Sequence, residues 1–515
     1  MNGAESLVRT LLNGDVNVCF ANPGTSEMHF VSALDRVEGV RCILGLFEGV
    51  VTGAADGYYR VAGKPAATLL HLGPGLGNGL ANLHNAKKAR SGIVNVVGEH
   101  AGYHIKYDAP LTADIEGVAR PMSDWVKTSH WSKTIAGDGA LAIQAARTAP
   151  GQIATLILPA DTAWGEADGP APVAEPAPRA AVPQAAIADG VRALKKGSSS
   201  MLLLGNAALR GKALECAGRI AAKTGCGLMS EFNNARIERG AGRAPVRQLP
   251  FVVDNALAVL KDTRQLVLVG AKLPVSFFAY PGKPSVLVPE GCEVVTVAGA
   301  EADLEGALEA LAGELGARDA APLANAPTYD GALPTGNITL EGLGAFFNKM
   351  IPENAIVMDE AVTSGRAFTG ATMGARPHDW MNIMGGSIGW GLAASVGAAI
   401  AAPDRKVIAL EGDGSAMYTQ QALWTMAREN LDVTIVIFAN RAYKILVNEL
   451  ANVGGGTPGR NAMSMLTLGS PALDWVTIAK GYGVESGRAT TLDELAVQFK
   501  RGLDKHGPYL VELVM

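Results

Sequence analysis

The chain has 515 residues, 48% of them hydrophobic and 18% charged, and this composition favours large buried cores and argues against disorder. Its formal net charge of −5 comes without a basic block, so the sequence argues against nucleic acid as a partner. The length predicts two to four domains.

The amino terminus lacks the basic-then-apolar pattern of a secretory signal. The longest uncharged apolar run of interest, residues 391–402, is too short and too rich in Gly and Ala to cross a bilayer, which needs about 20 apolar residues. It predicts a tightly packed internal helix instead. The five cysteines form no Cys-x-x-Cys pair, which argues against structural zinc and against a disulfide framework. We therefore expect a cytoplasmic protein without a membrane partner.

Two proline-rich stretches, residues 166–184 and 317–337, predict linkers because so many prolines forbid helices and central strands. They divide the chain into expected domains at 1–165, 185–316 and 338–515. In each domain, short apolar runs alternate with helical patterns, which predicts three doubly wound α/β domains with parallel sheets. The runs expected to be strands are 66–71, 93–97, 201–204, 266–269, 356–358, 407–410 and 433–438.

In the first domain, Glu48 opens a helical pattern directly after the apolar run 42–47. An isolated Glu there would usually be a helix amino-terminal charge favoured by the helix dipole. An Ala-Asp-Gly-Tyr-Tyr-Arg stretch follows at 55–60. His71 ends the next expected strand in a glycine-rich turn, although a lone His is more often a structural hydrogen-bonding group than a catalyst.

In the third domain, the strand at 407–410 ends in Glu-Gly-Asp-Gly-Ser, and the next expected strand is followed by Asn440. Asp413 and Asn440 should therefore sit at the ends of neighbouring strands, where open α/β sheets bind ligands. A carboxylate, an amide oxygen and a backbone carbonyl form a hard-oxygen set that suits Mg²⁺ shared with phosphates. Gly-Asp-Gly alone could be a tight turn, but the Asn at this offset favours a site for metal and phosphate.

These two patterns together resemble the thiamine-diphosphate-dependent enzyme family. The resemblance implies pyrimidine-binding, central and diphosphate-binding domains in that order, with thiamine diphosphate and Mg²⁺ as cofactors. It also implies that the metal ligands are Asp413, Asn440 and the carbonyl of Ala442.

The resemblance also assigns cofactor contacts. Glu48 is expected to hydrogen-bond N1′ of the aminopyrimidine and so to activate the cofactor without touching the substrate. Ile388 is expected to hold the two cofactor rings in a V shape, although plain core packing would explain it equally well, and Gly386 to offer its carbonyl to the 4′-amino group. Further expected cofactor contacts are Gly412, Gly414, Ser415 and Thr363.

The first domain also resembles benzoylformate decarboxylase. The stretch 22–27 is similar to an Asn-Pro-Gly-Ser motif, with Thr25 where the substrate-contacting Ser lies, and the stretch 69–73 is similar to a strand that ends in an active-site His. Glu48, His71 and Thr25 are therefore the expected catalytic residues. The expected substrate pocket comprises Thr25, Ser26, His71, Leu111, Phe278 and Leu446.

Two positions depart from the decarboxylases. Phe278 stands where benzoylformate decarboxylase carries its second active-site His, and Leu446 where pyruvate-decarboxylase-like enzymes carry a Glu. Without these proton donors, the enamine left by loss of CO₂ from a 2-oxo acid should attack a second carbonyl. This favours a carboligase similar to the acetolactate synthase large subunit. His100 and His104, near the position of a paired His in the pyruvate decarboxylases, could restore the missing acid.

Several alternatives stay open. The chain could be a simple decarboxylase of the benzoylformate decarboxylase type, or resemble a 2-hydroxyacyl-CoA lyase. A nicotinamide or flavin oxidoreductase is disfavoured because the glycines at 73–77 fail the Gly-x-Gly-x-x-Gly spacing. Retention of Glu48 argues against a non-catalytic regulatory homologue.

FAD is not expected, because Gly205-Asn206-Ala207 shows no flavin-binding pattern. The remaining expected partners are a small-molecule 2-oxo acid and further copies of this chain. The resemblance implies a homodimer or homotetramer with active sites between chains.

Overall fold

The N-terminal domain is built on a six-stranded, fully parallel sheet in the computed structural model, which describes all 515 residues. The strand order is β2-β1-β3-β4-β6-β5. The two central strands β3 and β4 are buried along their whole length, which explains their continuous apolar sequence. The strands are β1 (Val18–Asn22), β2 (Arg41–Leu44), β3 (Ala66–Leu70), β4 (Ile93–Glu99), β5 (Trp125–Thr128) and β6 (Ile153–Pro159). The helices are α1 (Gly3–Asn13), α2 (Met28–Arg36), α3 (Glu48–Ala62), α4 (Leu72–Ala89), α5 (Ile115–Ala119), α6 (Ile135–Arg147) and α7 (Ala160–Trp164).

The central domain carries a five-stranded parallel sheet in the order β10-β8-β7-β11-β12. Its strands are β7 (Ser200–Leu204), β8 (Gly227–Ser230), β10 (Arg247–Gln248), β11 (Gln265–Val269) and β12 (Glu293–Ala298). Its helices are α8 (Gln184–Leu194), α9 (Gly211–Thr224), α10 (Val253–Leu260) and α11 (Leu304–Glu314).

The C-terminal domain has a seven-stranded sheet in the order β17-β18-β16-β15-β13-β14-β9. Its strands are β9 (Ile237–Arg239), β13 (Ile356–Glu360), β14 (His378–Asn382), β15 (Val407–Gly412), β16 (Val433–Ala439), β17 (Glu485–Ala489) and β18 (Tyr509–Val514). Its helices are α12 (Leu340–Met350), α13 (Phe368–Ala371), α14 (Gly391–Ala401), α15 (Asp413–Ala416), α16 (Ala422–Arg428), α17 (Lys444–Asn452), α18 (Arg460–Leu466), α19 (Trp475–Gly481) and α20 (Leu492–Asp504).

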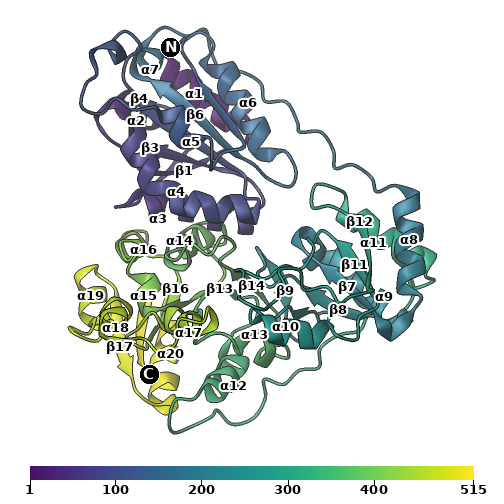
Figure 1. Ribbon diagram of the computed structural model, residues 1–515. Coiled ribbons are helices and arrows are strands. Elements are labelled where there is room, and N and C mark those ends of the chain that lie inside the picture. The colour runs from purple at the N-terminus through teal and green to yellow at the C-terminus, as the bar shows by residue number, and fades with distance from the viewer.

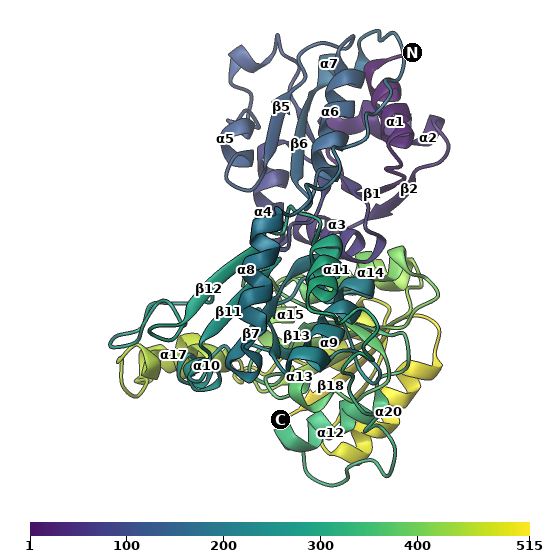
Figure 2. The ribbon, with the colours of Figure 1, turned by 90° about the vertical axis from the view of Figure 1, so that its right-hand side faces the viewer.

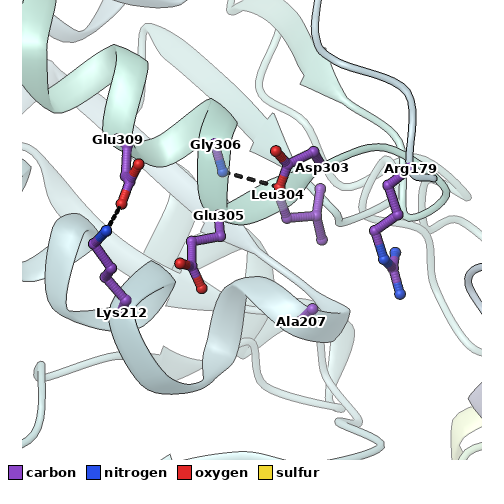
Figure 3. A pocket seen from close by; sticks show the side chains of 8 residues that line it. All are labelled: Arg179, Ala207, Lys212, Asp303, Leu304, Glu305, Gly306 and Glu309. Carbon is purple, nitrogen blue, oxygen red and sulfur yellow. Dashed lines mark hydrogen bonds and ion pairs between the residues drawn. The ribbon is translucent and has the colours of Figure 1, made fainter.

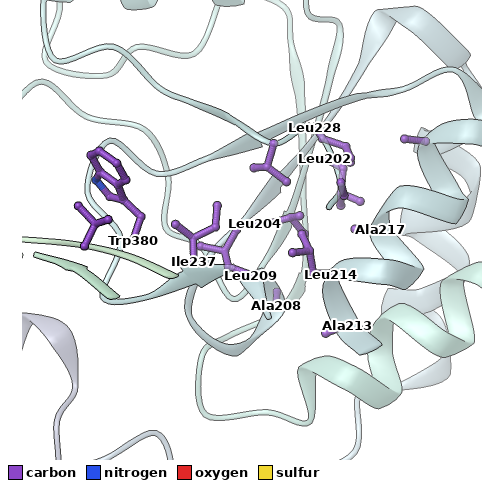
Figure 4. Packing of buried hydrophobic residues seen from close by; sticks show 14 of the residues in the cluster. Leu202, Leu204, Ala208, Leu209, Ala213, Leu214, Ala217, Leu228, Ile237 and Trp380 are labelled. Carbon is purple, nitrogen blue, oxygen red and sulfur yellow. The ribbon is translucent and has the colours of Figure 1, made fainter. Parts of the chain in front are cut away.

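Strand β9 is the departure from the expected three parallel sheets. It comes from the central segment of the chain, yet it pairs antiparallel with β14, so that His378 lies opposite Arg239. A strand of three residues at a sheet edge leaves no periodic signal in the sequence. Figure 4 shows Ile237 of β9 between Trp380 and the leucines of the central domain, and one hydrophobic cluster runs through both domains.

The other expected elements are present. Every run predicted to be a strand is a strand, and residues 391–402 form the nearly fully buried helix α14. The two proline-rich stretches contain no helix and only isolated bridges, apart from the beginning of α8. None of the helices combines the length and apolar character needed to cross a bilayer.

The N-terminal domain stands over the other two, which lie side by side (Figure 1). Its helices α3 and α4 face α14, and the turned view shows the same stacking (Figure 2). Helix α3 meets α14 backbone to backbone. A Cβ on Gly57 would lie 2.0 Å from the carbonyl oxygen of Ala394, and one on Gly397 would lie 1.8 Å from that of Ala54. Only glycine permits this approach.

A buried polar network fixes the same contact between the N- and C-terminal domains. The Asp56 carboxylate accepts hydrogen bonds from Arg60 Nε (2.9 Å), Ser91 Oγ and Trp390 Nε1 (2.7 Å). The Arg60 guanidinium in turn donates to the carbonyl of Asn382 at 2.8 Å. The Ala-Asp-Gly-Tyr-Tyr-Arg stretch therefore joins two domains.

Candidate active site

Glu48 is the first residue of α3 and is 8% exposed. Its Oε2 accepts a hydrogen bond from Asn78 Nδ2 of α4 at 3.0 Å, while its Oε1 accepts none. The helix amino terminus favours the negative charge. One carboxylate oxygen is therefore held by the protein and the other is free for an N–H donor of a ligand. Asn78 was not among the predicted site residues.

His71 precedes α4 and lies in a small polar network. Its Nδ1 is 2.8 Å from Oε2 of Glu27, which is 2% exposed. Glu27 also accepts hydrogen bonds from the backbone N–H of Gly24 (2.7 Å) and from Ser26 Oγ (2.6 Å). Thr25 is exposed beside them. The structure thus brings together the predicted Thr25, Ser26 and His71 around a glutamate that the sequence reasoning missed.

The Glu48 and His71 side chains are neighbours in one domain. A Cβ on Gly75 would lie 3.1 Å from Glu48 Oε1 and 3.2 Å from His71 Cβ. The predicted pocket residue Leu111 lies on the loop before α5, which reaches the start of α4 where Ala113 packs against Gly73. The N-terminal domain therefore holds its predicted site residues in one region.

His100 lies at the end of β4, close enough to His71 for their charges to interact. Burial lowers the pKa of His100, and the charges of His104 and His71 lower it further. The rings of His100 and His104 are 5.6 Å apart. A second imidazole is therefore available near His71, within the same domain.

Asp413 and Asn440 occupy the ends of the neighbouring strands β15 and β16, as predicted. The Asp413 carboxylate accepts hydrogen bonds from the backbone N–H groups of Gly414 (2.9 Å) and Arg441 (2.7 Å). Asn440 Oδ1 accepts one from the N–H of Ala442 (3.0 Å). Arg441 adopts a left-handed φ of 56°, and this tight turn brings the chain back to Asp413. Burial raises the pKa of Asp413, and the two amides counteract that rise.

The chemistry of these donors fits a hard cation and a phosphate. A carboxylate and an amide oxygen, each with lone pairs left, suit Mg²⁺. A Cβ on Gly414 would lie 2.5 Å from the ring of Tyr443, so glycine permits the close approach of this ring. Gly412 and Ser415 flank it, and Thr363 follows β13, whose end lies beside that of β15.

The loop between β14 and α14 carries Gly386 and Ile388. Gly386 has a φ of 73°, and a Cβ on it would lie 2.8 Å from the Phe277 ring, so the position requires glycine. Ile388 is only half-buried and belongs to none of the hydrophobic clusters, which argues against the plain packing role. Its side chain is available to a ligand.

A buried carboxyl pair anchors this loop. Glu360 accepts hydrogen bonds from the backbone N–H groups of Gly389 (2.7 Å) and Gly391 (2.6 Å). Burial raises the pKa of the adjacent Glu411, and the Glu360 charge raises it further. The sequence reasoning did not identify this pair.

Phe278 and Leu446, two of the three predicted apolar pocket residues, are exposed in the chain. Phe278 is 53% exposed and stacks edge-on against Phe277, with ring centroids 4.7 Å apart. Leu446 of α17 is 46% exposed. A hydrogen bond of 2.7 Å from Tyr280 to Glu449 ties α17 to the loop that carries Phe278. Neither α17 nor α18 contains a buried residue.

The predicted site is therefore built as two groups. No hydrogen bond within the chain joins Glu48 or His71 to Asp413 or Asn440. We call these groups the N-terminal half-site (Glu27, Glu48 and His71) and the C-terminal half-site (Asp413, Asn440 and Ala442).

A separate cavity of about 400 Å³ lies in the central domain, between α9 and α11 (Figure 3). It contains none of the predicted site residues. Its charged side chains are largely used within the protein, since Lys212 pairs with Glu309 and Asp303 caps α11.

Gly205 and Gly270, at the ends of the neighbouring strands β7 and β11, lie close together, since a Cβ on Gly205 would be 2.6 Å from the carbonyl oxygen of Gly270. The expectation that no FAD binds in the central domain stays a prediction.

The fold and the half-sites define a class of protein: an α/β enzyme whose last domain suits a metal-held diphosphate and whose first domain presents a buried carboxylate. Residues 1–118 match the family description "Thiamine pyrophosphate enzyme, N-terminal TPP binding domain", and residues 366–513 match "Thiamine pyrophosphate enzyme, C-terminal TPP binding domain". The chain belongs to the thiamine-pyrophosphate-dependent enzyme family.

Relatives agree over the whole length. The chain is 50% identical to the "Putative acetolactate synthase large subunit IlvX" of Mycobacterium tuberculosis, over 100% of this chain and 99% of the relative. It is 30% identical to benzoylformate decarboxylase of Pseudomonas aeruginosa, over 96% and 95% respectively. A solved structure, the thiamine diphosphate-dependent 4-hydroxybenzoylformate decarboxylase of Rhodococcus jostii RHA1, superimposes with a TM-score of 0.86 at 27% identity, covering 99% of this chain and 98% of the other.

Proposed function

We propose that this chain, loaded with thiamine diphosphate and Mg²⁺, decarboxylates a 2-oxo acid and joins the remaining carbon unit to a second carbonyl compound. The observation that carries this proposal is the apolar character of Phe278 and Leu446, where relatives of the decarboxylase type would carry proton donors. The 50% identity to a protein named for acetolactate synthesis supports the same reaction type.

The residues divide into holding and activating roles. Bound thiamine diphosphate would supply the electron sink that permits loss of CO₂. Asp413, Asn440 and the Ala442 carbonyl would hold Mg²⁺, and Gly412, Gly414, Ser415 and Thr363 would receive the diphosphate. Glu48 would accept a hydrogen bond at its free Oε1 from the pyrimidine. Gly386 and Ile388 would orient the rings.

The outcome after loss of CO₂ depends on proton delivery. A positioned acid typically accelerates protonation by about 10²–10⁴-fold. His71 presents one imidazole, with Thr25 beside it for the substrate carboxylate, while the apolar side chains of Phe278 and Leu446 offer no proton. Slow protonation leaves time for a second carbonyl compound to react.

Product partition tests this proposal. The purified holoenzyme is incubated with pyruvate alone, and with pyruvate plus an aldehyde, and the products are identified. We expect hydroxyketones or acetohydroxy acids to dominate. Free aldehyde as nearly the only product would instead establish a simple decarboxylase, the second candidate, which the proximity of His100 to His71 favours.

We also propose that each active site forms between two chains, so that the protein is at least a homodimer. Helices α17 and α18, which bury none of their residues in the single chain, support this arrangement. A mixing experiment tests it. Glu48→Gln and Asp413→Ala variants should each be inactive, whereas a hybrid of the two contains one site with both residues intact. Recovery of activity on mixing is expected; no recovery in verified hybrids would place the whole site within one chain.

A further inference from the structure

The Glu27 carboxylate is buried against the backbone at the end of β4. A Cβ on Gly98 would lie 1.6 Å from Glu27 Oε1, so the carboxylate occupies space that any other residue at 98 would fill. Burial of an unpaired carboxylate is costly, yet Glu27 is 2% exposed and accepts three hydrogen bonds. Such a residue is either a structural anchor or a partner that orients a functional group.

The geometry favours the second role. The Glu27 carboxylate can only accept at His71 Nδ1, so the 2.8 Å contact places the imidazole proton on Nδ1. Ser26 Oγ donates to the other carboxylate oxygen at 2.6 Å and is 3.4 Å from Nδ1, so it does not compete strongly for the imidazole. The remaining nitrogen, Nε2, is then the one available to a substrate.

Two further glycines confine the imidazole itself. A Cβ on Gly24 would lie 2.1 Å from His71 Nδ1, and one on Gly75 would lie 3.2 Å from His71 Cβ. Gly24 also donates its N–H to Glu27 at 2.7 Å, so the same turn fixes both partners. The Glu27–His71 pair is therefore confined to one arrangement. The residues that confine it lie at the ends of β1, β3 and β4 of a single domain.

We propose that Glu27 is a positioning residue: it fixes the tautomer and orientation of His71, so that Nε2 faces the substrate and exchanges the proton there. The inference rests on the proposed function for the role of His71. A carboxylate that holds an imidazole in one tautomer is worth about 10²-fold or more in turnover when the imidazole transfers protons.

The first test needs no substrate. Nitrogen-15 NMR of histidine-labelled holoenzyme, with the His71 signal assigned from His71→Asn, should show the proton on Nδ1. Glu27→Met removes the acceptor and should convert His71 to a mixture of tautomers. The matched control is Asp138→Asn, which alters another buried carboxylate of the same domain, hydrogen-bonded to Ser129 at 2.7 Å, and should leave the His71 signal unchanged. An unchanged His71 tautomer in Glu27→Met would overturn the proposal.

The second test is a double-mutant cycle on consumption of pyruvate and benzoylformate. Glu27→Met should lower kcat about 10²-fold or more with little change in KM, and should have no further effect in a His71→Asn background. Glu27→Gln retains an acceptor and should recover part of kcat. If Glu27→Met does not fold, the cycle is run with Glu27→Gln. Equal losses in both backgrounds would show a merely structural role.

The proposed carboligation and the proposed role of Glu27 can be refuted independently of each other. Product partition can establish a simple decarboxylase while the tautomer result stands, because the NMR measurement does not depend on the reaction. Conversely, carboligation can hold while His71 proves indifferent to Glu27.

Discussion

The two half-sites differ in how far the folded chain completes them. In the N-terminal half-site, Glu27 holds His71 and Asn78 holds Glu48 through side-chain hydrogen bonds inside one domain. In the C-terminal half-site, Asp413 and Asn440 accept hydrogen bonds only from backbone amides. The adjacent helices α17 and α18 bury none of their residues.

This difference matches the two proposed roles, which are to orient proton-transferring side chains in the N-terminal half-site and to bind a cation in the C-terminal half-site. Side chains that move protons must hold a particular direction, and the N-terminal domain sets that direction when it folds. Side chains that bind a cation need free lone pairs, and backbone amides can position them without consuming all of these. The comparison therefore predicts that damage to one half-site abolishes turnover while binding persists, and that damage to the other abolishes binding.

The largest loss of cofactor binding is expected from Asp413→Ala. Loss of one of two side-chain ligands should weaken thiamine diphosphate binding in the presence of Mg²⁺ by about 100-fold or more. Calorimetry measures the affinity, and circular dichroism confirms the fold. Asp474→Ala, at the exposed start of α19 in the same domain, is the control and should bind normally. Wild-type affinity in Asp413→Ala would remove this residue from the metal site.

Glu48→Gln should have the opposite pattern of effects, in which turnover is lost while the cofactor still binds. The amide cannot carry the negative charge that polarises the pyrimidine, so kcat should fall by about 10²–10⁴-fold. Thiamine diphosphate affinity should change only a few-fold, because the diphosphate anchor is intact. Glu38→Gln changes an exposed glutamate of the same domain and should leave both quantities unaltered. Unchanged turnover in Glu48→Gln would indicate a protein that binds the cofactor without using it.

Asp56→Ala tests the contact between α3 and α14, which joins the domains that carry the two half-sites. It leaves the buried Arg60 guanidinium unpaired, which typically costs about 3–5 kcal/mol in the free energy of unfolding. Asp15→Ala breaks the exposed pair with Lys64 and should cost about 1 kcal/mol or less. Urea unfolding of the two variants measures the difference. Similar losses would mean that the Asp56 network does not stabilise the contact between α3 and α14.

The smallest effect is expected for His378 and concerns the pH dependence of the free energy of unfolding. Burial lowers its pKa to about 3, so between about pH 6.5 and 3 the unfolded chain binds a proton that the folded chain does not. Stability should therefore fall as pH falls through this window. From pH 7.5 to 5, His378 should account for a loss of about 2 kcal/mol. His378→Asn should remove that share of the decline in urea unfolding. Parallel pH curves for the variant and the wild type would contradict the assignment.

The placement of Asp413 and Asn440 at neighbouring strand ends could be predicted from sequence because it depends on local signals. Asp413 and Asn440 each follow a buried strand, and neighbouring parallel strands end at one edge. The apolar run 391–402 likewise indicated a buried helix because nothing in it could face water.

The missed features depend on contacts between distant segments. Glu27 received no role from the sequence, and its burial depends on the distant contact with Gly98 of β4. Asn78 reaches Glu48 from another helix, and Glu360 meets Glu411 only through the register of β13 and β15.

Strand β9 also bears on how the chain can be dissected. Because residues 237–239 complete the C-terminal sheet, a fragment that starts at the second linker would leave the edge of β14 with unpaired N–H and C=O groups. Open edges of this kind invite pairing with strands of other molecules. Such a fragment should aggregate, because it also exposes the part of its hydrophobic cluster that packs against the central domain, whereas a fragment that begins at residue 185 keeps both the cluster and the edge covered. Through β9, the central segment of the chain therefore protects an edge strand of the C-terminal domain from pairing with other molecules.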